Sequence, residues 1–107
     1  MNIRIPVIGP LPASSEVTAD VDCAREIIRR VPGVRRVWFF GSLAARAGHS
    51  RSDLDFAVEG LPVEAHFAVL GDLMLALRAP VDLVRWEEAS NILRAEILRK
   101  GTVIYAA

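Results

Sequence analysis

The sequence is short of cysteine, of net charge and of long apolar runs, and each shortage excludes a class of protein. A single cysteine, Cys23, excludes an internal disulfide and a cysteine-based zinc site, and it is typical of a reducing cytoplasm. No apolar run approaches the ~20 residues that span a bilayer. Lys+Arg and Asp+Glu each number 13, so a broad cationic surface for duplex nucleic acid is missing. We therefore expect a cytoplasmic protein with no membrane segment, and we do not expect nucleic acid as its main partner.

The first 13 residues are predicted to form an irregular lead-in. Pro6, Pro10 and Pro12 interrupt the apolar run, and only Arg4 supplies a charge before it, which argues against an export signal. Residues 14–107 are predicted to form one domain, because compact domains are most often about 100–150 residues long. A content of 52% hydrophobic and 24% charged residues is typical of a globular chain.

The spacing of apolar residues predicts a small α/β (α+β) domain, with a mixed sheet of about four strands flanked by helices. Pro and Gly residues mark the ends of most elements. Val63, Phe67, Leu70, Met74 and Leu77 are expected on the inner side of the second long helix, and Ala89, Ile92, Leu93 and Ile97 on that of the last. The expected elements are helices at 14–31, 62–78 and 90–100 and strands at 34–40, 53–59, 81–86 and 102–105.

Two carboxylates stand out in the strand predicted at 53–59. The period of two places Asp53 and Asp55 on the same face, about 7 Å apart at a rise of roughly 3.3 Å per residue. Magnesium takes one or two carboxylates together with substrate phosphates, so the pair suits a metal-bound nucleotide. Taken alone, the pair is weak evidence, and a solvent-exposed strand surface without function is the better interpretation.

The preceding strand ends abruptly at Gly41-Ser42. A glycine lets backbone amides approach a phosphate, and the Ser42 hydroxyl can donate to it. If Ser42 also opens a short helix through Arg46, the helix N-terminus adds positive potential. An ordinary turn is the alternative for Gly-Ser alone, but the joint pattern with Asp53 and Asp55 favours a nucleotide site.

Asp82 interrupts the apolar strand predicted at 81–86. Burying an unpaired carboxylate is costly, which favours a role for Asp82 as a third metal ligand or a general base. An edge-facing or ion-paired aspartate is the alternative. His66, Trp38 and Trp86 are expected to serve packing rather than ligand binding.

These residues resemble the minimal nucleotidyltransferases (MNT) of the DNA polymerase beta superfamily. The likeness covers about residues 20–105 and is closest to the MNT-type antitoxins, whose chains also end with a helix, a glycine and a short apolar strand, as around Gly101 here. The motif consists of Phe40-Gly41-Ser42, then Ser52-Asp53-Leu54-Asp55-Phe56, with ten residues between Ser42 and Asp53, and finally Val81-Asp82-Leu83-Val84.

The resemblance implies transfer of AMP from ATP, with Mg²⁺, to a hydroxyl of a partner protein. In the MNT group that partner is a HEPN-domain ribonuclease toxin, and the acceptor is a tyrosine. It implies that Asp53, Asp55 and Asp82 hold the metals and that Asp82 also helps to orient or deprotonate the acceptor. Gly41 and Ser42, with Arg46 and Ser52 nearby, are assigned to the nucleotide. A homo-oligomer and a hetero-oligomer are both compatible with the sequence.

Arg46 departs from the family pattern. The family usually has Gly-Ser-x-Ala-Arg-Gly, whereas this chain has Gly41-Ser42-Leu43-Ala44-Ala45-Arg46. A shift of one residue turns a helical side chain by about 100°, which would move the guanidinium away from the phosphate. This shift keeps open an antitoxin of weak or absent activity that neutralises its partner by binding. Independently of Arg46, a nucleotidyltransferase acting on a small molecule is a second alternative.

Overall fold

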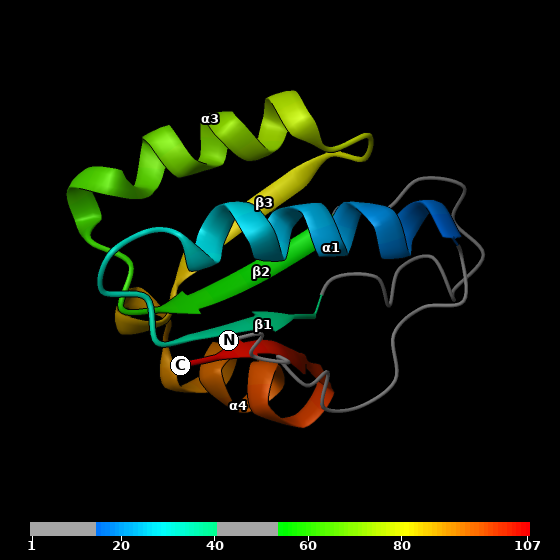
Figure 1. The fold of residues 1–107 in the computed structure, drawn as a ribbon. Helices are drawn as coiled ribbons and strands as arrows, with labels where there is room; N and C mark the ends of the chain where they lie inside the picture. Colours follow the sequence, from blue (N-terminus) through cyan, green and yellow to red (C-terminus); the bar gives the residue numbers. More distant parts are fainter. Residues whose placement is uncertain (1–14, 41–53) are drawn as a thin grey trace.

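The computed structural model describes residues 15–40 and 54–107. The predicted order of helices and strands is confirmed, and one mixed four-stranded sheet carries the helices (Figure 1). The elements are α1 (Ser15–Arg29), β1 (Arg36–Phe39), β2 (Leu54–Glu59), the 3-10 turn η1 (Val63–Ala65), α3 (His66–Ala76), β3 (Val81–Arg85), the 3-10 turn η2 (Trp86–Glu88), α4 (Asn91–Lys100) and β4 (Thr102–Ala106). No helix in these described segments is long and apolar enough to cross a membrane.

The strands lie in the order β3-β2-β1-β4, so β3 and β4 form the edges of the sheet. Strand β1 runs antiparallel to β2 and to β4, whereas β2 and β3 are parallel. A parallel pair needs a crossover connection, and η1 with α3 supplies it between β2 and β3. The mixed sheet that the sequence predicts is therefore present.

Helices α1 and α3 lie side by side over one face of the sheet, and α4 covers part of the other face (Figure 1). The larger core lies under α1 and α3, where Ile28 and Leu73 are fully buried against Phe56 of β2. A smaller core lies under α4, where Ile97 packs with Trp38 and Ala57. Alternation along β2 thus sends Phe56 to one core and Ala57 to the other.

The inner side of α3 differs from the prediction. Val69 and Leu73 face the sheet, followed by Leu77 just beyond the helix, whereas Phe67 and Met74 are 81% and 63% exposed. A 3-10 turn precedes α3, and α3 itself is apolar all round, so periodicity could not select the buried side. Of the predicted inner set, Leu77 is buried and Leu70 partly buried, but Val63, Phe67 and Met74 are outside.

The buried side of helix α4 differs from the prediction at one residue. Ile97 is fully buried and Leu93 packs against the small core, as predicted. Ile92 is 80% exposed, which the prediction had wrong. Ser90 caps the helix by accepting a hydrogen bond from the Leu93 N–H at 3.1 Å, so Ile92 lies in the first turn, on the solvent side.

Two glycine turns meet at the end of the sheet away from Asp55. Gly33, after α1, and Gly60, after β2, have φ angles of 97° and 91°, which L side chains rarely adopt. A Cβ built on Gly60 would lie 2.1 Å from the Gly33 carbonyl oxygen. The two turns can pack this closely only because neither carries a side chain.

Candidate active site

The structure describes two of the predicted site residues, Asp55 in β2 and Asp82 in β3. Gly41, Ser42, Arg46, Ser52 and Asp53 lie outside the described residues, so their roles stay predictions. The described part of the site therefore consists of two carboxylates and the strand ends that surround them.

Asp55 and Asp82 are direct partners in the parallel β2–β3 register. Neighbouring strands lie about 4.8 Å apart, and paired residues of parallel strands point to the same face. This is also the face of Ala57, on which α4 packs farther along the sheet. Asp55 is half-buried and Asp82 is exposed. Sheet pairing thus brings together two carboxylates that are 27 positions apart in the sequence.

Asp82 is exposed, so the burial expected for it is wrong, although Asp82 does lie beside Asp55. Its carboxylate is not buried, because β3 is an edge strand and Asp82 is exposed there. Its Oδ1 accepts a hydrogen bond from the Leu83 N–H at 2.9 Å. What marks Asp82 is its position beside Asp55 in the parallel β2–β3 register.

Strand β1 ends beside the same carboxylates. The Phe40 N–H donates to the Asp55 carbonyl oxygen at 2.9 Å, so the chain leaves β1 next to Asp55. In the sequence, Gly41 follows Phe40 directly, and Asp53 directly precedes Leu54. The chain therefore enters and leaves the segment that carries the Gly41-Ser42 and Asp53 motif from the end of the sheet where Asp55 and Asp82 lie.

The donor set fits a hard divalent cation. Carboxylate oxygens are the ligands that Mg²⁺ prefers, and Mg²⁺ commonly takes one or two of them with the remaining positions filled by water and phosphate. A cation between Asp55 and Asp82 would also offset their mutual repulsion. Within residues 15–40 and 54–107 no group of three or more His, Cys, Asp or Glu could hold a metal by itself. The two described carboxylates fit two of the oxygen ligands that Mg²⁺ takes.

Asp20 of α1 is a residue that sequence reasoning missed. It is only 6% exposed, and its carboxylate accepts hydrogen bonds from the N–H groups of Arg78 (3.1 and 3.2 Å) and Ala79 (3.1 Å). This contact fixes the turn that leads from α3 into β3, the strand that carries Asp82. The sequence carried a signal, because Asp20 occupies the buried stripe of α1 four residues before Ala24 and eight before Ile28.

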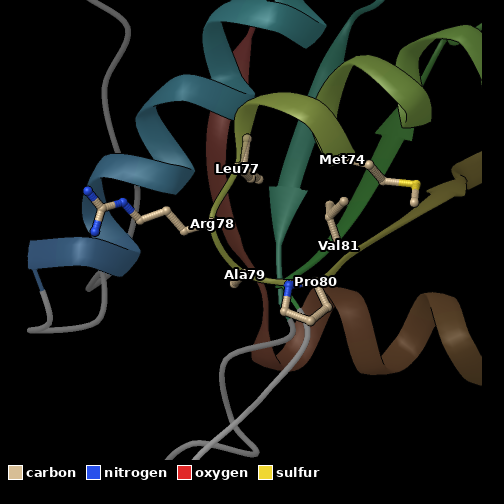
Figure 2. A pocket seen from close by; sticks show the side chains of 6 residues that line it. All are labelled: Met74, Leu77, Arg78, Ala79, Pro80 and Val81. Carbon is tan, nitrogen blue, oxygen red and sulfur yellow. The ribbon is translucent and has the colours of Figure 1, made fainter.

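A shallow pocket lies at the same turn, between the end of α3 and the start of β3 (Figure 2). In this view Arg78 extends toward α1, away from Val81. Among the described residues the pocket is lined by Met74, Leu77, Arg78, Ala79, Pro80 and Val81, and neither Asp55 nor Asp82 is one of them.

The packing roles predicted for His66 and the two tryptophans agree with the structure. His66 Nε2 donates to the Leu83 carbonyl oxygen at 2.7 Å, which ties α3 to β3. Trp38 and Trp86 stack with ring centroids 4.6 Å apart in the smaller core. The Arg94 guanidinium covers Trp86 at 4.8 Å from its ring centroid. These side chains are engaged with the protein itself.

The family model that matches this chain is that of polymerase beta nucleotidyltransferases, over residues 23–107. The match covers most of the chain and all of the predicted site, so the chain belongs to this nucleotidyltransferase family. No curated protein matches it.

Several solved structures are similar to the chain, and they are toxin-antitoxin structures. A mutant toxin-antitoxin pair named MntA-HpeT is 26% identical, with a TM-score of 0.68, over 81% of this chain and 72% of that chain. A toxin-antitoxin structure with AMP-PNP is 25% identical, with a TM-score of 0.65, over 83% and 73%. A tri-AMPylated HEPN toxin of Shewanella oneidensis in complex with an MNT antitoxin is 23% identical, with a TM-score of 0.68, over 84% and 72%. Together with the family match, these structures confirm the resemblance to MNT-type antitoxins.

Proposed function

We propose that this protein transfers AMP from ATP to a hydroxyl of a HEPN-type toxin and thereby acts as its antitoxin. The observation that carries the proposal is the side-by-side arrangement of Asp55 and Asp82, at the end of the sheet where β1 leads into Gly41-Ser42. The register thus offers two carboxylates side by side, and Mg²⁺ commonly takes one or two carboxylates together with substrate phosphates.

Each motif residue has a defined role in this proposal. Asp53, Asp55 and Asp82 hold Mg²⁺, and Gly41, Ser42, Arg46 and Ser52 hold the nucleotide. The metal supplies neutralisation of the charge that develops on the phosphates. Asp82 lies on the edge strand and is exposed, so it is the described carboxylate that an acceptor hydroxyl can reach, and it orients that hydroxyl.

The similar solved structures support the choice of partner. One of them contains a HEPN toxin that carries AMP groups together with an MNT antitoxin, and another contains AMP-PNP. We infer that ATP is the nucleotide here and that a HEPN-domain protein is the acceptor. A hydroxyl acceptor on a folded protein also suits a site that lies at the exposed edge of a sheet.

The test is to incubate the protein with ATP, Mg²⁺ and a HEPN-domain protein from the same genome and to weigh the partner by intact-mass spectrometry. We expect AMP adducts on the HEPN protein, and we expect Asp55→Asn and Asp82→Asn each to reduce their rate by at least about 100-fold, the scale of losing one group that stabilises charge in the transition state. Asp72→Asn, an exposed aspartate on α3, is the matched control and should keep the wild-type rate. The absence of an adduct with any of the four nucleoside triphosphates would contradict the proposal.

A second function is favoured by one observation, the displacement of Arg46 by one position from the family pattern. An antitoxin that does not bind the triphosphate would neutralise the toxin by binding to it, without modifying it. Toxin neutralisation that survives Asp55→Asn with Asp82→Asn, without any AMP adduct, would establish this function in place of the enzymatic one.

A further inference from the structure

The outer side of α3 is an apolar surface that no described element covers (Figure 1). Asp72 is the only acidic or basic residue of α3 besides His66. We define the outer stripe of α3 as the residues at helical spacing on this side, together with Val63 of the preceding turn. Its large members are Val63, Phe67, Met74 and Leu75, which are 59%, 81%, 63% and 90% exposed, and its small members are Ala68 and Gly71.

Gly71, in the middle of the stripe, has no explanation among the described residues. A Cβ at Gly71 would meet none of their atoms within 4 Å. Its φ is not positive, since Gly33 and Gly60 are the only described glycines with positive φ. Glycine inside a helix lowers stability relative to alanine. Its use on an exposed face is accounted for by the close approach of another backbone from outside.

The stripe is complementary to itself about Gly71. Phe67 lies four residues before Gly71 and Leu75 four residues after it, so a two-fold axis at Gly71 sets Phe67 of one copy against Leu75 of the other. The same axis sets Ala68 against Met74, a small side chain against a large one. Each contact occurs twice, as an isologous interface requires.

The area of the stripe is sufficient for a weak dimer. The four large side chains expose roughly 500 Å² of apolar surface, near the upper end for the largest patch on a monomer. Pairing two copies would bury roughly 1,000 Å² in total, the lower limit of a specific interface. We propose that the outer stripe of α3 is a homodimer interface, in which two antiparallel α3 helices cross at Gly71. This proposal does not depend on the enzymatic function.

The first test is sedimentation velocity of the full chain over a series from about 1 µM to about 1 mM, the range in which a small interface dissociates. We expect a reversible monomer–dimer equilibrium, and the double variant Phe67→Glu with Leu75→Glu should raise its Kd at least tenfold. The matched control is Ile92→Glu with Leu98→Glu, two residues of α4 that are 80% and 63% exposed. The control should leave the Kd within about twofold of wild type, because α4 is not part of the interface.

The second test separates the interface from general effects on folding. Gly71→Ala fills open space in the monomer, so it should raise the melting temperature of the dilute protein while it raises the dimer Kd. Gly71→Cys in a Cys23→Ala background should form a disulfide-linked dimer on mild oxidation, whereas Ile92→Cys in the same background should not, because only position 71 meets its own copy at the axis.

Three results would each overturn the proposal. One is a wild-type monomer at every concentration, and another is a dimer that the Phe67 and Leu75 substitutions leave unchanged. The third is a monomeric wild type that binds a HEPN protein through Phe67 and Leu75, which would assign the outer stripe to that partner instead of a second copy.

Discussion

Replacing Asp82 with asparagine should have opposite effects on stability with and without a divalent cation. The substitution keeps the shape of the side chain and an oxygen that can accept the Leu83 N–H at 2.9 Å. It removes one of the two like charges that the β2–β3 register places opposite each other, the other being that of Asp55. A change in charge with little change in packing isolates the electrostatic role of the pair.

The expected size of the effect follows from the geometry. An opposed cross-strand charge pair is worth about 0.2–1 kcal/mol, and Asp82 is exposed, so the lower half of that range applies. For a domain of this length about 1 kcal/mol moves the melting temperature by about 4–8 °C. In EDTA we therefore expect Asp82→Asn to melt about 1–5 °C above wild type. With Mg²⁺ and ATP at roughly 100 times the Kd, wild type should gain about 2.7 kcal/mol, and the variant should gain little.

The assay is thermal unfolding followed by circular dichroism, in EDTA and again with Mg²⁺ and ATP. Asp72→Asn, an exposed aspartate with no opposed carboxylate in the sheet, serves as the control and should respond to Mg²⁺ and ATP as wild type does. A variant that is less stable than wild type in EDTA by more than about 1 kcal/mol would show that Asp82 serves folding and would refute the reasoning. An equal response of Asp82→Asn and wild type to Mg²⁺ and ATP would remove Asp82 from the metal site.

Three further predictions concern the scaffold of the domain. Asp20→Ala leaves two backbone N–H groups without their acceptor and should lower the free energy of unfolding by about 2–4 kcal/mol in urea titrations, whereas Asp20→Asn, which keeps one acceptor oxygen, should lose about half as much. Gly60→Ala, at φ 91° and with its Cβ 2.1 Å from a carbonyl oxygen, should cost more than about 3 kcal/mol, while Gly71→Ala, in open space, should not destabilise the chain. The hydrogen bond from Arg29 holds the pKa of Glu26 below its ordinary value, so its stabilisation is present at neutral pH and is lost as the pH falls through that lowered pKa. The difference in melting temperature between wild type and Glu26→Gln should therefore decrease as the pH is lowered. A difference that increased at low pH would contradict this predicted direction of the pH dependence.

Local patterns in the sequence predicted the elements and the motif. Pro32-Gly33, Gly60 and Pro80 mark chain reversals that the structure contains, because proline and glycine act on the backbone without help from distant residues. Alternation along β2 correctly separated the face of Asp55 from that of Phe56. The order of elements followed from such signals, whereas the resemblance to a nucleotidyltransferase came from the spacing of Gly41-Ser42, Asp53-Leu54-Asp55 and Asp82.

The pairing of Asp55 with Asp82, the buried side of α3 and the contact of Asp20 with the α3–β3 turn were decided only by the tertiary structure. Each depends on residues far apart in the chain. Strand register is set by which residues of two strands hydrogen-bond, and a helix that is apolar all round takes its buried side from what it packs against. The motif spacing therefore predicted which residues carry the chemistry, whereas packing and strand register set the position of Asp82 beside Asp55 and the side of α3 that is exposed.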